Sequence, residues 1–129
     1  MDQSDNLRFQ LDPRSGVPYY RQIIDQILAG IATGALGVGT QLPTVRALAV
    51  ELAVNFNTVA RAYKELEIRG ILNTQQGTGT FVGEQTVAPD DVERRRLVNQ
   101  LLDEFLARAA QQGLTLAEIR TALEEREVK

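Results

Sequence analysis

Residues 43–69 read PTVRALAVELAVNFNTVARAYKELEIR, and the spacing of their apolar side chains predicts two short helices around a tight turn. Ala49 is small, as close packing of one helix on another requires, and Ala53 stands at the turn, where glycine is commoner. The positions expected to face inward are all apolar: Leu48, Ala49, Leu52, Val54, Val59 and Ala62. This pattern indicates a helix-turn-helix unit, whose second helix enters the major groove of DNA.

The outward positions of the second helix carry mostly short polar side chains: Asn55, Asn57, Thr58, Arg61 and Lys64. Donors and acceptors of this kind suit the edges of base pairs. Two plainer interpretations stay open on these residues alone. Any hairpin of two helices shows apolar residues at helical spacing, and the asparagines could serve as a helix cap and a turn former.

The segments on either side extend the unit to a winged helix. An apolar stripe from Pro18 to about Thr33 predicts a first helix, and Gly70 is placed to end the third helix near Arg69. Two short β-type runs then flank the glycine-containing loop 75–79, which predicts a β-hairpin. A hairpin in this position is a wing whose tip can approach a phosphate or the minor groove, although its glycines could serve the turn alone.

The remainder of the chain predicts a linker near 84–92 and two more helices. The first runs from about Asp91 to Gln112, and Thr115 with Glu118 forms a capping box that opens the second, which ends near Glu125. Two short helices cannot enclose an apolar face alone, so they need a partner surface, most simply a second subunit. The residues expected to form this interface are Leu97, Leu101, Leu102, Phe105, Leu106, Ile119 and Leu123.

Composition excludes several classes of protein. The 129 residues include no Cys and no His, which removes imidazole acid–base catalysis, thiol nucleophiles and the usual zinc ligands. We therefore expect no enzyme activity, no metal site and no cofactor. No apolar run approaches the ~20 residues of a membrane span, and residues 1–10 lack a signal-peptide pattern, so a cytoplasmic protein is expected, associated with the nucleoid when bound to DNA.

The net charge of −3 is unevenly distributed. Residues 17–83 carry five basic and four acidic groups, whereas residues 84–129 carry seven basic and ten acidic groups. The acidity therefore lies mainly in the tail, and the DNA-binding segment is only weakly basic. Its phosphate contacts must come partly from backbone amides and from Thr, Gln and Asn.

At this point the succession of LPTVRALA, NTVARAYKELE and GTGTFV resembles the GntR family of bacterial transcription regulators. The short tail resembles that of the smallest group in the family, the YtrA-like regulators, and the resemblance runs from Asp12 to about Arg126. It implies a homodimeric repressor that binds a near-palindromic double-stranded DNA operator. The third helix would lie in the major groove and the wing on the adjacent minor groove.

The resemblance also implies particular contacts. Arg46, in the LP-x-x-R motif, corresponds to a DNA-contacting arginine, and many relatives carry Arg at the positions of Phe56 and Ala60, where only the neighbouring Arg61 remains here. Base readout at those positions therefore differs, and no operator sequence carries over. The candidate DNA-contacting residues are Arg46, Asn55, Phe56, Asn57, Thr58, Arg61, Lys64, Gly77, Thr78 and Gly79.

We therefore predict a mostly α-helical protein with a small β-hairpin. It would consist of an N-terminal arm (1–16), a winged helix-turn-helix domain (17–85) and a two-helix dimerisation tail (90–126). The alternative is a winged-helix module that binds protein instead of DNA, which the weak basicity favours slightly and for which Phe56 is the visible apolar candidate. The tail does not identify a small-molecule effector.

Overall fold

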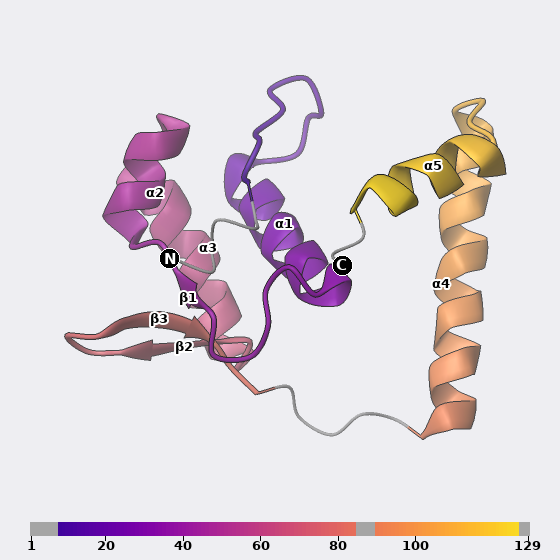
Figure 1. Ribbon diagram of the computed structural model, residues 1–129. Helices are drawn as coiled ribbons and strands as arrows, with labels where there is room; N and C mark the ends of the chain where they lie inside the picture. The colour runs from indigo at the N-terminus through magenta and orange to yellow at the C-terminus, as the bar shows by residue number, and fades with distance from the viewer. Residues whose placement is uncertain (1–7, 85–89, 127–129) are drawn as a thin grey trace. The chain divides into compact units, whose positions relative to one another are not determined.

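The computed structural model describes residues 8–84 and 90–126 and divides the chain into two compact units, Met1–Gln85 and Thr86–Lys129. The fold is mostly α-helical with one small sheet, as predicted (Figure 1). The first unit contains α1 (Tyr19–Thr33), β1 (Gln41–Leu42), α2 (Val45–Leu52), α3 (Phe56–Ile68), β2 (Leu72–Gln75) and β3 (Gly79–Val82). The second unit contains α4 (Asp91–Gln111) and α5 (Leu116–Arg126).

Local capping signals determine where α2 and α3 begin and end. The Thr44 hydroxyl accepts a hydrogen bond from the Ala47 N–H and caps α2. The turn passes through Ala53, which adopts a left-handed conformation with φ 56° and ψ 44°. The Asn55 side chain then caps α3 by accepting from the Asn57 N–H at 2.7 Å. Helix α3 therefore starts at Phe56.

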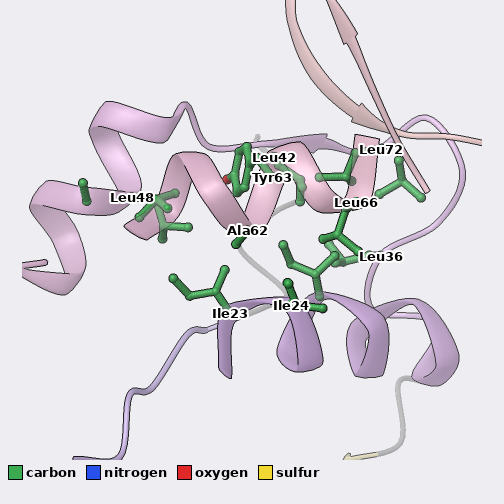
Figure 2. Close-up of a cluster of buried hydrophobic side chains, with 13 residues drawn as sticks. Ile23, Ile24, Leu36, Leu42, Leu48, Ala62, Tyr63, Leu66 and Leu72 are labelled. Atoms are coloured by element: carbon green, nitrogen blue, oxygen red, sulfur yellow. The ribbon is translucent and has the colours of Figure 1, made fainter. Parts of the chain in front are cut away.

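The hydrophobic core of the first unit lies between α1 and α3 (Figure 2). Ile23 and Ile24 of α1 point toward Ala62 and Leu66 of α3, and all four side chains are buried. The inward positions of the helix-turn-helix are buried or half-buried, as predicted from their spacing. Helices α2 and α3 are thus held by a core that α1 completes.

Tyr63 adds a polar tie inside this core. Its side chain is buried and its hydroxyl donates a hydrogen bond to the Pro43 carbonyl at 2.7 Å, which joins α3 to the segment preceding α2. Burial, and secondarily the carboxylate of Glu51, raises the pKa of the Tyr63 hydroxyl. The neutral, hydrogen-bonded form is therefore the one that the fold favours.

The predicted hairpin is present as β2 and β3, which pair in antiparallel register from Leu72 opposite Val82 to Gln75 opposite Gly79. The sheet has a third member that sequence analysis missed. Strand β1 pairs with β3, so that Gln41 lies opposite Phe81 and the strand order is β1-β3-β2. The wing is consequently anchored along β3 to the chain that leads into α2.

Two glutamines of α1 hold the segment that precedes it. The Gln22 amide is buried; it accepts from the Asp12 N–H at 2.8 Å and donates to the carbonyls of Asp12 and Val17 at 2.9 and 2.8 Å. One turn later, the Gln26 amide pairs with both backbone groups of Gln10. The predicted arm is irregular in residues 8–16 but is packed on α1, and residues 1–7 lie outside the described residues.

The second unit follows the local signals closely. Asp90 caps α4 by accepting from the Glu93 N–H, and Gly113, at φ 74°, follows its end. The capping box of α5 is reciprocal: the Glu118 N–H donates to the Thr115 hydroxyl, and the Thr115 N–H donates to the Glu118 carboxylate. The part of the predicted linker between residues 85 and 89 lies outside the described residues.

Candidate nucleic-acid interface

The N-terminal half of α3 presents an exposed polar surface. Asn55, Asn57 and Lys64 are exposed and Thr58 is half-exposed, while Val59 on the opposite side is buried in the core. The side-chain oxygen of Asn55 is engaged as the cap, so its amide nitrogen is the group of this side chain that can donate to another partner. This surface lies at the first turns of the helix, the part that reaches base edges in helix-turn-helix proteins.

Arg46 and Phe56 line one shallow hollow beside this surface. Arg46 is exposed on the first turn of α2, and Phe56, the first residue of α3, is half-exposed with 50% of its surface accessible. The hollow has a volume of about 440 Å³, and its other lining residues are Ala49, Val50 and Val54. A cationic residue of α2 and an aromatic residue of α3 therefore line the same hollow.

Arg61 is engaged within the protein. Its guanidinium carbon lies 3.7 Å from the centre of the Tyr20 ring on α1, and its Nε lies 3.6 Å from a carboxylate oxygen of Glu65. A cation stacked on an aromatic ring is stabilised by the negative face of the ring. Of the predicted DNA-contacting side chains, this one also contributes to holding α3 on α1.

The tip of the wing is built for close approach of the backbone. Gly77 has φ 80° and Gly79 has φ 140°, conformations that other residues rarely adopt. A Cβ on Gly79 would also lie 2.5 Å from Nε2 of Gln41. That same Nε2 donates to the Thr78 carbonyl at 3.2 Å, so Gln41 braces the tip from β1.

The base of the wing is tied to α3. The Thr74 hydroxyl donates to a Glu67 carboxylate oxygen at 2.7 Å and lies 3.0 Å from the hydroxyl of Thr80 across the hairpin. These contacts couple the direction of the hairpin to the end of α3. The three wing residues predicted to contact DNA are exposed or half-exposed beyond this point.

The residues predicted to form the dimer interface lie on the second unit. Leu101, Leu102, Phe105 and Leu123 are exposed, and Leu97, Leu106 and Ile119 are half-buried. Leu116 and Ala122 of the last helix are also exposed in the single chain. Within this unit, an apolar hollow of about 470 Å³ lies between α4 and α5, lined by Phe105, Leu114, Glu118, Ile119, Ala122, Leu123 and Arg126.

Three contributors to this geometry were missed by sequence analysis. Gln41 braces the wing, Gln22 holds the segment before α1, and Val50 widens the apolar part of the hollow. Val50 had an available signal, since it is an apolar residue at an outward position of α2. The two glutamines had none, because an amide side chain reveals its partners only after folding.

In the part of the chain that the structure describes, no helix is long and apolar enough to cross a membrane. The same described residues contain no group of three or more His, Cys, Asp or Glu side chains placed to hold a metal ion.

Comparison with known proteins agrees with this geometry. Residues 19–82 match the family described as bacterial regulatory proteins, gntR family. The chain is also 35% identical over 116 residues to the HTH-type transcriptional repressor YtrA of Bacillus subtilis, covering 90% of this chain and 89% of that protein. The matched family and this relative are transcription regulators and not enzymes.

Solved structures show the same fold. YtrA from Sulfolobus acidocaldarius, a GntR-family transcription factor, superposes with a TM-score of 0.58 at 33% identity, covering 77% of this chain and 97% of that one. The DNA-binding domain of AraR, solved in complex with operator ORX1, gives a TM-score of 0.52 at 28% identity, covering 60% of this chain and 96% of that one. The winged helix-turn-helix, its sequence motifs and its short helical tail all converge: the chain belongs to the GntR family of bacterial DNA-binding transcription regulators.

Proposed function

We propose that this regulator is a repressor that binds a near-palindromic operator as a homodimer. The observation that carries the proposal is the exposed polar surface at the start of α3, supported from behind by the buried core and flanked by a braced wing. A rigid helix with polar groups at its first turns fits the major groove, and a hairpin beside it fits the adjacent minor groove. DNA binding is assigned to residues 17–85 and dimerisation to residues 90–126.

Each part of the surface has a role in this proposal. Arg46 donates to a guanine edge or to a phosphate, Asn57 pairs with adenine, and Thr58 contacts a phosphate or a thymine methyl group. Arg61 and Lys64 face the phosphate backbone, Arg61 from its position over Tyr20. Asn55 contributes its amide nitrogen and Phe56 its ring, while Gly77, Thr78 and Gly79 carry the backbone of the wing to the minor groove.

Repression is proposed from two relatives. The similar protein of Bacillus subtilis is a transcriptional repressor, and the AraR domain of similar fold was solved on its operator. A repressor of this kind acts where the chromosome is, in the cytoplasm, and is associated with the nucleoid when bound. An operator that overlaps a promoter would be occluded by the bound protein.

Dimerisation is proposed from the apolar surface of the tail. Leu101, Leu102 and Phe105 are exposed side by side on α4, and α5 adds Leu123. Burying such a face against a second copy stabilises both copies by roughly 25 cal/mol per Å² of apolar surface removed from water. A two-fold symmetric pair would carry two copies of α3 to half-sites on the order of one helical turn apart.

Selection of bound duplexes from a random pool, followed by footprinting, tests DNA recognition. We expect one continuous symmetric protected site. Arg46→Ala should weaken binding by about 1–3 kcal/mol if a base contact is lost. If a phosphate contact is lost instead, the slope of the logarithm of the binding constant against the logarithm of the salt concentration should fall in magnitude by about one. Unchanged affinity of this variant at every salt concentration would remove Arg46 from the interface.

Sedimentation tests the role of the tail. Phe105→Glu places a charge on the apolar face of α4, whereas Ala107→Glu places the same charge on an exposed position on the far side of the helix. We expect the first variant to be monomeric and to lose most operator affinity. A monomer binds only one half-site and lacks the gain in affinity that a dimer has when its second subunit binds the other half-site. The second variant should remain dimeric. A dimeric Phe105→Glu protein with full affinity would locate the dimer interface elsewhere.

A further inference from the structure

The hollow between α2 and α3 combines two chemistries. It is lined by four apolar residues, Ala49, Val50, Val54 and Phe56, and by the cationic residue Arg46. Val50 and Phe56 are 77% and 50% exposed, so apolar side chains of both helices meet water at the same place. Single exposed apolar residues are ordinary on protein surfaces, but these two line one concave site together with a cation.

The position of the hollow decides what can occupy it. Phe56 is the first residue of α3, next to the Asn55 cap and one residue before Asn57. In the proposed complex this turn faces the edges of base pairs. A base edge in the major groove offers one apolar feature, the C5-methyl group of thymine, while its other features are hydrogen-bond donors and acceptors. A phenyl ring cannot hydrogen-bond to those polar groups, but it can bury a methyl group.

We infer that Phe56, with Val50 lining the same hollow, is a specificity-determining residue that contacts the methyl group of a thymine at one position of each half-site. The inference rests on the proposed function and adds a defined requirement to it. Arg46 lines the same hollow and would reach a neighbouring guanine or phosphate, so the required thymine lies beside the Arg46 contact. A cytosine at that position would present an amino group and no methyl to the ring.

The size of the effect follows from the burial of one methyl group. Removing a buried methyl costs about fourfold in affinity for one half-site and about fifteenfold when both half-sites are changed. The same change at a thymine that no protein side chain contacts removes a methyl group that meets only water. The contact therefore predicts sensitivity at one thymine per half-site.

The test uses the full chain and an operator obtained by selection from a random pool. Each thymine of the operator is replaced in turn by deoxyuridine, which keeps the base pair and removes only the methyl group. Dissociation constants are measured by fluorescence anisotropy at fixed salt for the wild type, for Phe56→Ala and for Ile68→Ala. Ile68 is the matched control because it is a 76% exposed apolar residue at the opposite end of α3, away from the hollow.

For the wild type and for Ile68→Ala, replacing one particular thymine of a half-site by deoxyuridine should weaken operator binding about fourfold. Phe56→Ala should bind the operator with thymine and the operator with uracil at that position equally well. Phe56→Leu should bind the thymine operator more tightly than the uracil operator, by less than the wild type does, because leucine keeps an apolar side chain there. Circular dichroism checks that each variant is folded. Tight wild-type binding that is insensitive to uracil at every position overturns this inference and leaves the proposed function standing. A uracil penalty that persists unchanged in Phe56→Ala also overturns it, whereas failure to select any duplex refutes the proposed function and this inference together.

Discussion

Ala53 occupies a backbone conformation that its side chain disfavours, so replacing it with glycine should stabilise the protein. It is the single non-glycine residue with positive φ in residues 8–84 and 90–126, at φ 56° and ψ 44°. A left-handed conformation costs an L-residue roughly 1–2 kcal/mol because the Cβ crowds the following carbonyl oxygen. The side chain of Ala53 is exposed, so its removal sacrifices no core contact.

Glycine also has a cost, which sets the magnitude. A glycine gives the unfolded chain more freedom and lowers the free energy of unfolding by about 0.4–1 kcal/mol. The relief of strain exceeds this loss, so Ala53→Gly should raise the free energy of unfolding by about 0.8 kcal/mol. For a domain of this size the midpoint of thermal unfolding should rise by about 3–6 °C.

The assay is urea and thermal unfolding followed by circular dichroism at 222 nm, at one fixed protein concentration, because a dimer makes the midpoint concentration-dependent. Ala47→Gly is the matched control. Ala47 is exposed in the regular part of α2, so the same substitution should lower the free energy of unfolding by about 0.5–1 kcal/mol. If both variants are destabilised equally, the left-handed turn and the strain assigned to it are refuted.

Three further outcomes follow from the polar contacts of the first unit. Tyr63→Phe should lower the free energy of unfolding by about 1 kcal/mol, because the Pro43 carbonyl loses its 2.7 Å hydrogen bond; an unchanged urea midpoint would contradict this. Because the pKa of Tyr63 is raised in the folded protein, the contribution of its hydroxyl to the free energy of unfolding is present below about pH 10 and is lost at higher pH. The difference in the free energy of unfolding between wild type and Tyr63→Phe, measured by urea titration, should therefore narrow above that pH. Gln22→Ala should expose the Asp12 N–H to hydrogen exchange, while Gln26→Ala should leave that amide protected; equal protection of Asp12 in both variants would show that Gln22 does not hold the segment.

Much of the fold was accessible from sequence because its signals are local. The side chains of Thr44, Asp90 and Thr115 cap helices in the structure, and their partners are the N–H groups three residues later. Apolar spacing likewise identified the buried face of α3, since a regular helix brings every third or fourth residue to one side. The family motifs then limited the candidate interface to α2, α3 and the wing.

The rest depended on contacts between residues far apart in the chain. Strand β1 is defined by pairing with β3 some forty positions away, so the two residues Gln41 and Leu42 carry no strand signal of their own. The stacking of Arg61 on Tyr20 joins α3 to α1 and depends on how those helices pack. The single chain also leaves Leu101, Leu102 and Leu123 of the tail exposed, a result that periodicity alone could not distinguish from burial.

The sequence by itself determined the helices, their caps, the wing and the family, because hydrogen bonds within a few residues and the period of the apolar positions specify them. Only the tertiary structure decided how the surface is composed. Packing α2 against α3 brings Arg46, Val50 and Phe56 around one hollow, and the pairing of β1 with β3 places Gln41 under the wing tip. Such arrangements arise because a folded chain places side chains together according to the geometry of its core, and no local pattern encodes which distant residues will meet.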